Sequence, residues 1–155
     1  KDIPDFNTNF KIIPPIRSES DCNSLKEGLI DGTIDYLTSM HEPYDIDHKK
    51  VVFDDASPGS IGLESMFGLM CNQFTLEKTI DILTRGKMIF EIDDHSIDIG
   101  SKANLTLFNP DKNYEFSDKH ILSSSNNCAF LGNKLKGVVY GSVNGDKFTL
   151  NKLWT

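Results

Sequence analysis

The chain has 155 residues, 38% of them hydrophobic, and its 16 basic and 23 acidic side chains give a net charge of −7. This size fits one globular domain, and the negative charge argues against nucleic acid or an anionic membrane surface as the main partner. No run approaches the ~18 apolar residues of a membrane span, and the start of the chain has no apolar signal-peptide core, so we expect a cytoplasmic protein. The first residue is lysine rather than methionine, which suggests the hypothesis that the chain is a piece of a longer protein.

The first part of the chain alternates between strand and helix signals. A short apolar run that stops at two prolines predicts a strand at residues 9–13. A helix of about three turns is predicted next, because Ser18 and Asp21 fit a capping box and Gly32 can end the helix. A second strand is predicted at residues 33–38. The short connection between helix and strand is typical of a βαβ unit, whose strands are parallel.

A long polar loop is predicted from about residue 39 to residue 60. Loops of this length in compact domains are usually functional or mobile. After the loop, apolar residues recur at helical spacing and predict a strongly amphipathic helix; they are Leu63, Met66, Phe67, Met70, Cys71 and Phe74. Thr75 can cap a further short helix.

Beyond about residue 87 the pattern becomes that of antiparallel β structure. Strand-like runs lie at residues 88–90, 105–108, 138–140 and 148–150, with Asn109-Pro110 as a predicted interruption and Asn144-Gly145 as a predicted hairpin turn. We therefore predict an α/β protein in which residues 1–86 hold βα units and residues 87–155 form a carboxyl-terminal β domain.

The common catalytic motifs are absent. The four histidines form no HxH or HExxH pattern, and GxSxG is missing. The segment from Gly59 to Gly62 could present backbone N–H groups to an anion, but we favour the simpler interpretation that its glycines permit a tight entry into the helix. The three cysteines match neither a disulfide framework nor a CxxC zinc site and are expected to be buried, reduced thiols.

Motifs of one enzyme family nevertheless run through the chain in order. They are NFKIIPPIR at residues 9–17, EGLIDGTID at 27–35, TSMHEP at 38–43, FDDASPGSIGLE at 53–64, ANLTLFNP at 103–110, and AFLG at 129–132 with LKG at 135–137. These segments resemble the dihydroorotase motifs NxKxNPPLR, EGLxDGTID, ATDHAP, FxxAxFGxxGLE, ADLTLFDP and PFLGxxLKG. The resemblance covers nearly the whole chain.

This resemblance implies the carboxyl-terminal portion of a cyclic amidohydrolase. The implied fold is the last two βα units of a TIM (β/α)8 barrel, followed by strands of a small β-sandwich domain. Family members reversibly hydrolyse dihydroorotate to N-carbamoyl-aspartate in pyrimidine synthesis, using zinc to generate hydroxide and a strand-end aspartate to move the proton. The metal ligands of that site lie upstream of the matched motifs, so we predict no metal ligand in this chain.

The positions matched to the family's site residues are mostly altered. The catalytic aspartate falls at Met40, the substrate-binding asparagine at Ile13 and the substrate-binding histidine at Tyr44. Pro58-Gly59 keeps only the glycine of a Phe-Gly pair whose backbone holds the substrate. A thioether can neither carry a proton at neutral pH nor replace a hard carboxylate ligand, so we predict that this chain alone is inactive.

Three hypotheses remain open from the sequence. The chain is an enzyme fragment that works only with the missing amino-terminal barrel segment, or a non-catalytic dihydroorotase-like partner, for example of aspartate transcarbamoylase, or a small-ligand binding module built on residues 57–62. Because a barrel fragment would expose unpaired strand edges and apolar faces, we expect order only with the missing segment or through self-association.

Overall fold

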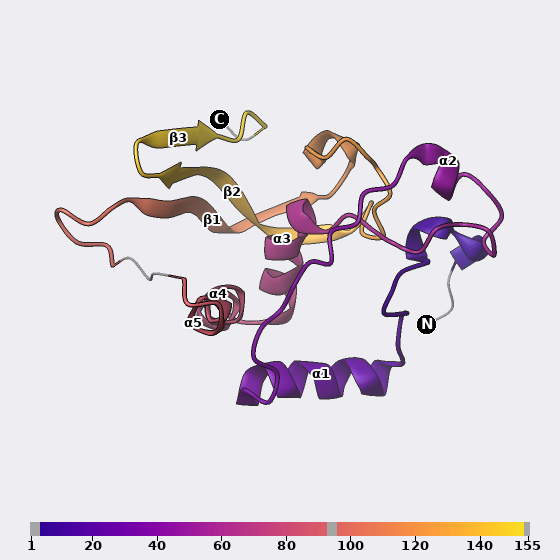
Figure 1. The fold of residues 1–155 in the computed structure, drawn as a ribbon, viewed down its shortest axis with the longest axis horizontal. Coiled ribbons are helices and arrows are strands. Elements are labelled where there is room, and N and C mark those ends of the chain that lie inside the picture. Colours follow the sequence, from indigo (N-terminus) through magenta and orange to yellow (C-terminus); the bar gives the residue numbers. More distant parts are fainter. Residues whose placement is uncertain (1–3, 93–95, 154–155) are drawn as a thin grey trace.

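The computed structural model describes residues 4–92 and 96–153. Helices come first along the chain and an antiparallel sheet comes last (Figure 1). The helical elements are η1 (Pro4–Phe6), η2 (Thr8–Phe10), α1 (Glu19–Asp31), α2 (Ile46–Lys49), α3 (Leu63–Gln73), α4 (Leu76–Thr84), α5 (Gly86–Ile89) and η3 (Asp118–His120). The strands are β1 (Asn104–Glu115), β2 (Lys134–Asn144) and β3 (Lys147–Leu150). In these described ranges no helix is both long and apolar enough to cross a membrane.

Helix α1 begins and ends where its sequence predicts. The Ser18 hydroxyl accepts the Asp21 N–H, and the Asp21 carboxylate accepts the Ser18 N–H, so both halves of the capping box are present. Gly32 ends the helix in the left-handed conformation, with φ of 88°. The predictions for this helix are confirmed.

The two parallel strands predicted in the first part of the chain are wrong. Thr8–Phe10 is a 3-10 helix, and residues 33–38 are irregular. A strand needs a neighbour to accept its ladder hydrogen bonds, and these two segments do not pair with each other. The only parallel pairing in the described residues is an isolated bridge between His41 and Ser60.

The two helices predicted after the long loop are present as α3 and α4. The Thr75 hydroxyl accepts the Lys78 N–H and caps α4. Leu29 of α1 packs with Met70 of α3 and Ile82 of α4 in one buried apolar cluster. Leu29 is the one large apolar side chain that α1 buries, and the Leu29 carbonyl also accepts from the Arg85 guanidinium at 2.9 Å. Most other side chains of α1 are exposed.

The sheet has the order β1-β2-β3, with every pair antiparallel. The predicted hairpin at Asn144-Gly145 is confirmed, since β2 ends at Asn144 and Gly145 has φ of 63°. Two of the predictions for this part of the chain are wrong. Asn109-Pro110 lies inside β1, at a register shift that frees the proline from ladder pairing. Residues 88–90 do not form a strand, because helix α5 extends to Ile89.

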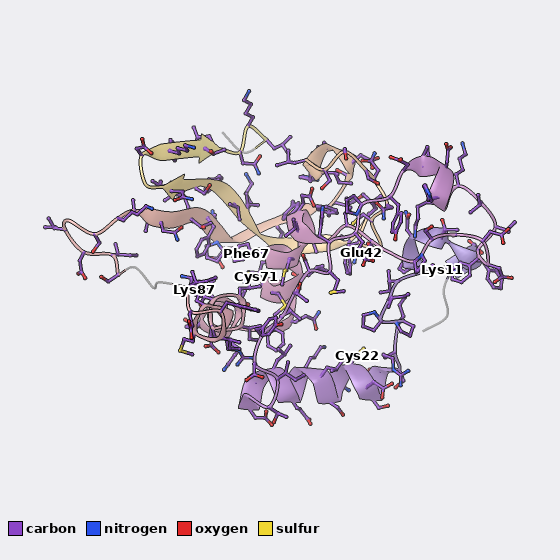
Figure 2. The ribbon with its side chains drawn as sticks, in the orientation of Figure 1. Lys11, Cys22, Glu42, Phe67, Cys71 and Lys87 are labelled. Carbon is purple, nitrogen blue, oxygen red and sulfur yellow. The ribbon has the colours of Figure 1, made fainter. Side chains whose placement is uncertain are left out.

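Helix α3 packs directly on β2, which joins the helical layer to the sheet (Figure 1). Two glycines permit this close approach: a Cβ at Gly68 would lie 2.9 Å from the Leu135 Cβ, and one at Gly137 would lie 2.9 Å from Phe67. Phe67 and Cys71 lie on the α3 face beside the sheet (Figure 2). The buried core below this contact contains Ile61, Phe116, Cys128 and Leu135.

Candidate functional site

Met40, at the position of the family's catalytic aspartate, lies on an exposed turn. Its φ is 42°, in the left-handed region, and 48% of its surface is exposed. It lines neither of the two hollows described below. The local conformation therefore directs the chain so that the next residue, His41, points into the protein and Met40 does not.

Ile13 and Pro58 line one hollow of about 660 Å³. Ile13 is matched to the family's substrate-binding asparagine, and Pro58 to the first residue of its Phe-Gly pair. The wall of this hollow is mostly apolar, and it contains two basic residues that already have partners. The Lys11 Nζ donates to the carbonyl oxygens of Phe53, at 2.9 Å, and Asp54, at 2.7 Å. The Arg17 Nε lies 3.3 Å from an Asp21 carboxylate oxygen. The hollow thus presents apolar surface and no uncommitted cation on its wall.

Tyr44 and Gly59, the remaining family positions, lie against each other. The space above Gly59, where a Cβ would stand, is filled by the Tyr44 ring at 2.5 Å and a Glu42 carboxylate oxygen at 2.9 Å. Tyr44 also lines a second, polar hollow of about 740 Å³ between residues 7–9, 44–50 and 124–127. The structure therefore brings together Tyr44 with Gly59, and Ile13 with Pro58, while Met40 stands apart.

The backbone of Gly59 is fully used inside the protein. Its N–H donates to the Lys11 carbonyl at 2.8 Å. Its carbonyl accepts from the Lys49 ammonium at 3.0 Å and from the Asn127 side-chain amide at 3.2 Å. A ligand at this glycine would have to displace one of these bonds before it could bind the main chain.

Lys49 is a buried residue beneath the candidate site that the sequence analysis missed. Its side chain is buried, 6% exposed, and its Nζ also donates to the Ser57 carbonyl at 2.9 Å. Burial, followed by the nearby charge of Lys11, lowers the pKa of Lys49. Nothing in the sequence distinguishes it from its exposed neighbour Lys50, because the groups that bind its ammonium are main-chain carbonyls, which every residue type supplies.

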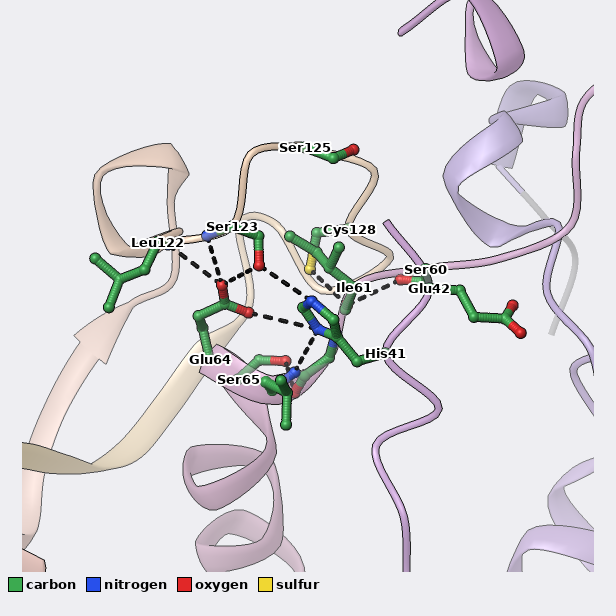
Figure 3. Close-up of polar contacts among 12 residues, drawn as sticks. His41, Glu42, Ser60, Ile61, Glu64, Ser65, Leu122, Ser123, Ser125 and Cys128 are labelled. Carbon is green, nitrogen blue, oxygen red and sulfur yellow. Dashed lines mark hydrogen bonds and ion pairs between the residues drawn. The ribbon is translucent and has the colours of Figure 1, made fainter. Parts of the chain in front are cut away.

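His41, Glu64 and Ser123 form a polar cluster at the beginning of α3 (Figure 3). The His41 Nδ1 accepts the N–H groups of Gly62, at 3.2 Å, and Leu63, at 3.3 Å. The Ser123 hydroxyl lies 3.1 Å from His41 Nε2 and donates to Glu64 Oε1 at 2.6 Å. The residue types match a hydrolytic triad, so the direction of each bond decides what the cluster can do.

The bond directions do not make His41 the base of a triad. Because Nδ1 of His41 accepts two N–H groups, the neutral ring has its proton on Nε2, which donates to the Ser123 oxygen. The Ser123 proton goes to the Glu64 carboxylate, so the imidazole does not accept it as the base of a triad does. The cluster fixes the start of α3 to the loop that contains Ser123.

The Glu64 carboxylate is held in its charged form. Burial raises its pKa, but hydrogen bonds from the Ser123 hydroxyl and from the backbone N–H groups of Ser123 and Leu122 outweigh this effect, so its pKa lies below the usual value of 4.5. Charge-assisted bonds of this kind are stronger than neutral ones. Glu64 is therefore a stabilising anion in the cluster.

The side chains do not fit a zinc site in the described ranges. No group of three or more His, Cys, Asp or Glu residues there is arranged to hold a metal ion. His41 has no free ring nitrogen, since Nδ1 and Nε2 both have partners. The three cysteines are free thiols, of which Cys128 is buried as predicted, whereas Cys22 on α1 is exposed and contradicts that expectation.

Comparison of the amino-acid sequence with those of curated proteins finds dihydroorotases. No protein-family profile matches the chain. The chain is 35% identical over 141 residues to a dihydroorotase of Caldicellulosiruptor saccharolyticus, which covers 86% of the chain and 33% of that protein. It is 33% identical over 156 residues to a dihydroorotase of Caldanaerobacter subterraneus, which covers 95% of the chain and 36% of that protein. The chain thus spans about a third of the length of these curated relatives.

Solved structures show the same fold at lower sequence identity. A D-hydantoinase aligns with a TM-score of 0.79 and 20% identity, over 93% of this chain and 34% of its own. The inactive dihydroorotase-like domain of a Chaetomium thermophilum CAD-like multifunctional protein aligns with a TM-score of 0.54 and 19% identity, over 86% of this chain and 36% of its own. The fold therefore matches a part of these hydantoinase and dihydroorotase-like structures. Together with the sequence relatives, this confirms the predicted resemblance: the chain is similar to about a third of the length of dihydroorotases.

Proposed function

We propose that this chain is the carboxyl-terminal portion of a dihydroorotase-type protein and does not hydrolyse dihydroorotate by itself. The observation that carries the proposal is the placement of Met40, an exposed thioether at the position of the family's proton-carrying aspartate. Losing a general acid or base costs on the order of 10²–10⁴ in rate. The zinc of the intact family would have to be held by residues outside this chain.

The test of this proposal is an assay of the chain with dihydroorotate and added zinc. We expect no ring opening above the uncatalysed rate and no stoichiometric zinc. Turnover by the chain alone would contradict the proposal, and its loss on Met40→Ala would further give the methionine a role that its chemistry does not support.

A second candidate, a non-catalytic structural partner, is favoured by the surroundings of Gly59. Both main-chain groups of Gly59 are occupied, and Tyr44 and Glu42 cover its free face. The adjoining hollow is apolar, whereas the ring-opened and ring-closed forms of dihydroorotate are polar anions. The inactive dihydroorotase-like domain among the structural neighbours supports this candidate, for which we propose aspartate transcarbamoylase as partner and the cytoplasm as location.

A longer protein that contains this chain separates the two candidates. Robust hydrolysis with bound zinc would support the enzyme fragment and overturn the structural partner. No hydrolysis, unchanged after Met40→Asp, together with co-elution with the aspartate transcarbamoylase of the same organism, would support the structural partner.

We also propose that the exposed apolar surface is covered by the remainder of a barrel or by self-association. Ile13 is 60% exposed, Val52 68% and Leu63 62%, all on the first part of the chain. Burying such side chains contributes about 25 cal/mol per Å² of apolar area. Sedimentation velocity of the chain alone tests this, and a monomer that stays compact and soluble at all concentrations would contradict it.

A further inference from the structure

The loop at residues 122–128, which we call the strap, leaves the β half of the chain and contacts the candidate site at two places. One contact is with the segment that contains Tyr44 and Gly59. The other, drawn in Figure 3, is with the start of α3. The two loops of the site are also joined to each other directly, by the bridge of His41 with Ser60 and by the bond from the Glu42 N–H to the Ser60 carbonyl. Further along, the Ser57 N–H donates to the His48 carbonyl, and the Lys49 ammonium donates to the Ser57 and Gly59 carbonyls. The strap adds a second set of bonds that contacts both loops from outside them.

Asn127 makes the first contact with all of its side-chain atoms that can hydrogen-bond. It is 4% exposed, and its Nδ2 donates to the carbonyls of Glu42, at 2.8 Å, and Gly59, at 3.2 Å. Its Oδ1 accepts the Tyr44 N–H at 3.1 Å and the Ser125 hydroxyl at 2.6 Å. Only an amide offers two donors and an acceptor in one short side chain, so no other residue of this size reproduces the set.

The strap backbone reinforces the same contact. The Ile61 N–H donates to the Asn127 carbonyl at 3.0 Å, and the Ala129 N–H donates to the Ser60 hydroxyl at 3.0 Å. Ile61 is completely buried in the core beneath. The loop around Gly59 is thus fixed from below by the core and from the side by Asn127.

The second contact is the cluster of Ser123 with His41 and Glu64. Through it the strap is linked to the residue that directly follows Met40. Asn127 holds the next residue, Glu42, through its carbonyl. The strap therefore fixes the backbone on the carboxyl-terminal side of Met40 at two successive residues.

We propose that Asn127 is a positioning residue of the candidate site and that the strap, together with the direct bonds between the loops, sets the spacing of the Tyr44 and Gly59 loops. The β half of the chain then determines the shape of the surface on the other half. This inference goes beyond the proposed function, because it holds whether the surface binds a small molecule, a protein or nothing.

Amide hydrogen exchange in the intact protein tests the proposal, with Asn127→Asp as the main variant. Aspartate keeps the acceptor for Tyr44 but replaces both donors with an anion that faces two carbonyl oxygens. We expect exchange at the Tyr44 and Gly59 amides to accelerate about tenfold or more, as loss of buried hydrogen bonds predicts. Exchange in the β2–β3 hairpin and in α1 should not change.

The matched control is Asn126→Ala, because Asn126 is the adjacent asparagine and is exposed. It should leave the exchange pattern unchanged. An unchanged pattern in Asn127→Asp, or an equal acceleration at every amide, would overturn the proposal, since the second result marks a general loss of stability. If Asn127→Asp does not fold, Ser125→Ala removes only the hydroxyl beside Asn127 and Tyr44, and the same local acceleration at Tyr44 is required.

Discussion

Helix α1 and helix α3 have similar lengths but hold very different places in the molecule. Helix α3 lies between the sheet and the rest of the helical layer, and a glycine at its closest contact lets it pack on β2 (Figure 1). Helix α1 is the outer element and buries only Gly28 and Leu29. The sequence of α1 nevertheless carries the stronger end signals. Local capping can therefore define a helix whose packing is minimal, whereas α3 depends on residues far along the chain.

The largest loss of stability is expected from a substitution in the buried core. Phe116→Ala empties a site that is 1% exposed in the core, so we expect a loss of about 3–5 kcal/mol in the free energy of unfolding. Leu25→Ala on α1, where leucine is 51% exposed, should cost less than about 1 kcal/mol. Denaturant unfolding of both variants measures the difference, and equal losses would show that the exposed face of α1 contributes as much to stability as the core does.

Lys49→Met should have the next largest effect. It removes the ammonium that the Ser57 and Gly59 carbonyls accept from, and leaves these buried oxygens without that donor. We expect a loss of about 2–4 kcal/mol, as for removal of a charged hydrogen-bond partner. The control is Lys50→Met at the exposed neighbour, which should cost less than about 0.5 kcal/mol. Thermal or denaturant unfolding separates the two.

A dependence on pH is expected from Glu64. Its folded-state pKa is lowered from 4.5, so its contribution to stability is complete above that value and is lost as the pH falls through the folded pKa. Stability measured against pH should therefore decrease in acid, with a shallower slope in Glu64→Gln. A slope identical in the two proteins would show that the carboxylate does not link this cluster to stability.

The smallest effect is expected at the amino terminus of α1. Ser18→Ala removes the hydroxyl that accepts the Asp21 N–H and should cost about 1 kcal/mol of local helix stability. Ser24→Ala, on the exposed side of the same helix, is the matched control and should be neutral or slightly stabilising. Hydrogen exchange at the first turn of α1 reports both, and a change of the same size in the sheet would mean that α1 is coupled to it more tightly than its packing indicates.

The sequence predicted those features that depend on contacts between residues close together in the chain, and failed for those that depend on distant residues. The caps at Ser18 and Thr75 and the turn at Gly145 rest on bonds within a few residues, and the sequence predicted all three correctly. The predicted strands at residues 9–13 and 33–38 failed because a strand is stabilised by a neighbouring strand, and within residues 4–92 and 96–153 these segments pair with none.

The candidate site shows the same dependence on range. The family motifs marked Met40, Tyr44 and Gly59 by position, but not Asn127 or Lys49, which hold the site loops. The partners of Asn127 are up to 85 positions away, and those of Lys49 are carbonyl oxygens, which every residue type supplies. Because every residue has a main-chain carbonyl, the residue types do not indicate which carbonyl will accept a hydrogen bond, and such contacts cannot be predicted from the sequence.

Several lysine and arginine side chains donate hydrogen bonds to main-chain carbonyl oxygens, and these bonds respond to pH differently from the Glu64 cluster. Lys11, Lys49 and Arg85 all donate to carbonyl groups, which do not titrate, so acidification that weakens the Glu64 cluster leaves these links intact. The Lys49 amine is shielded from solvent while its loop is closed. The rate at which a water-soluble ester acetylates Lys49 would therefore report the frequency at which this loop opens to solvent.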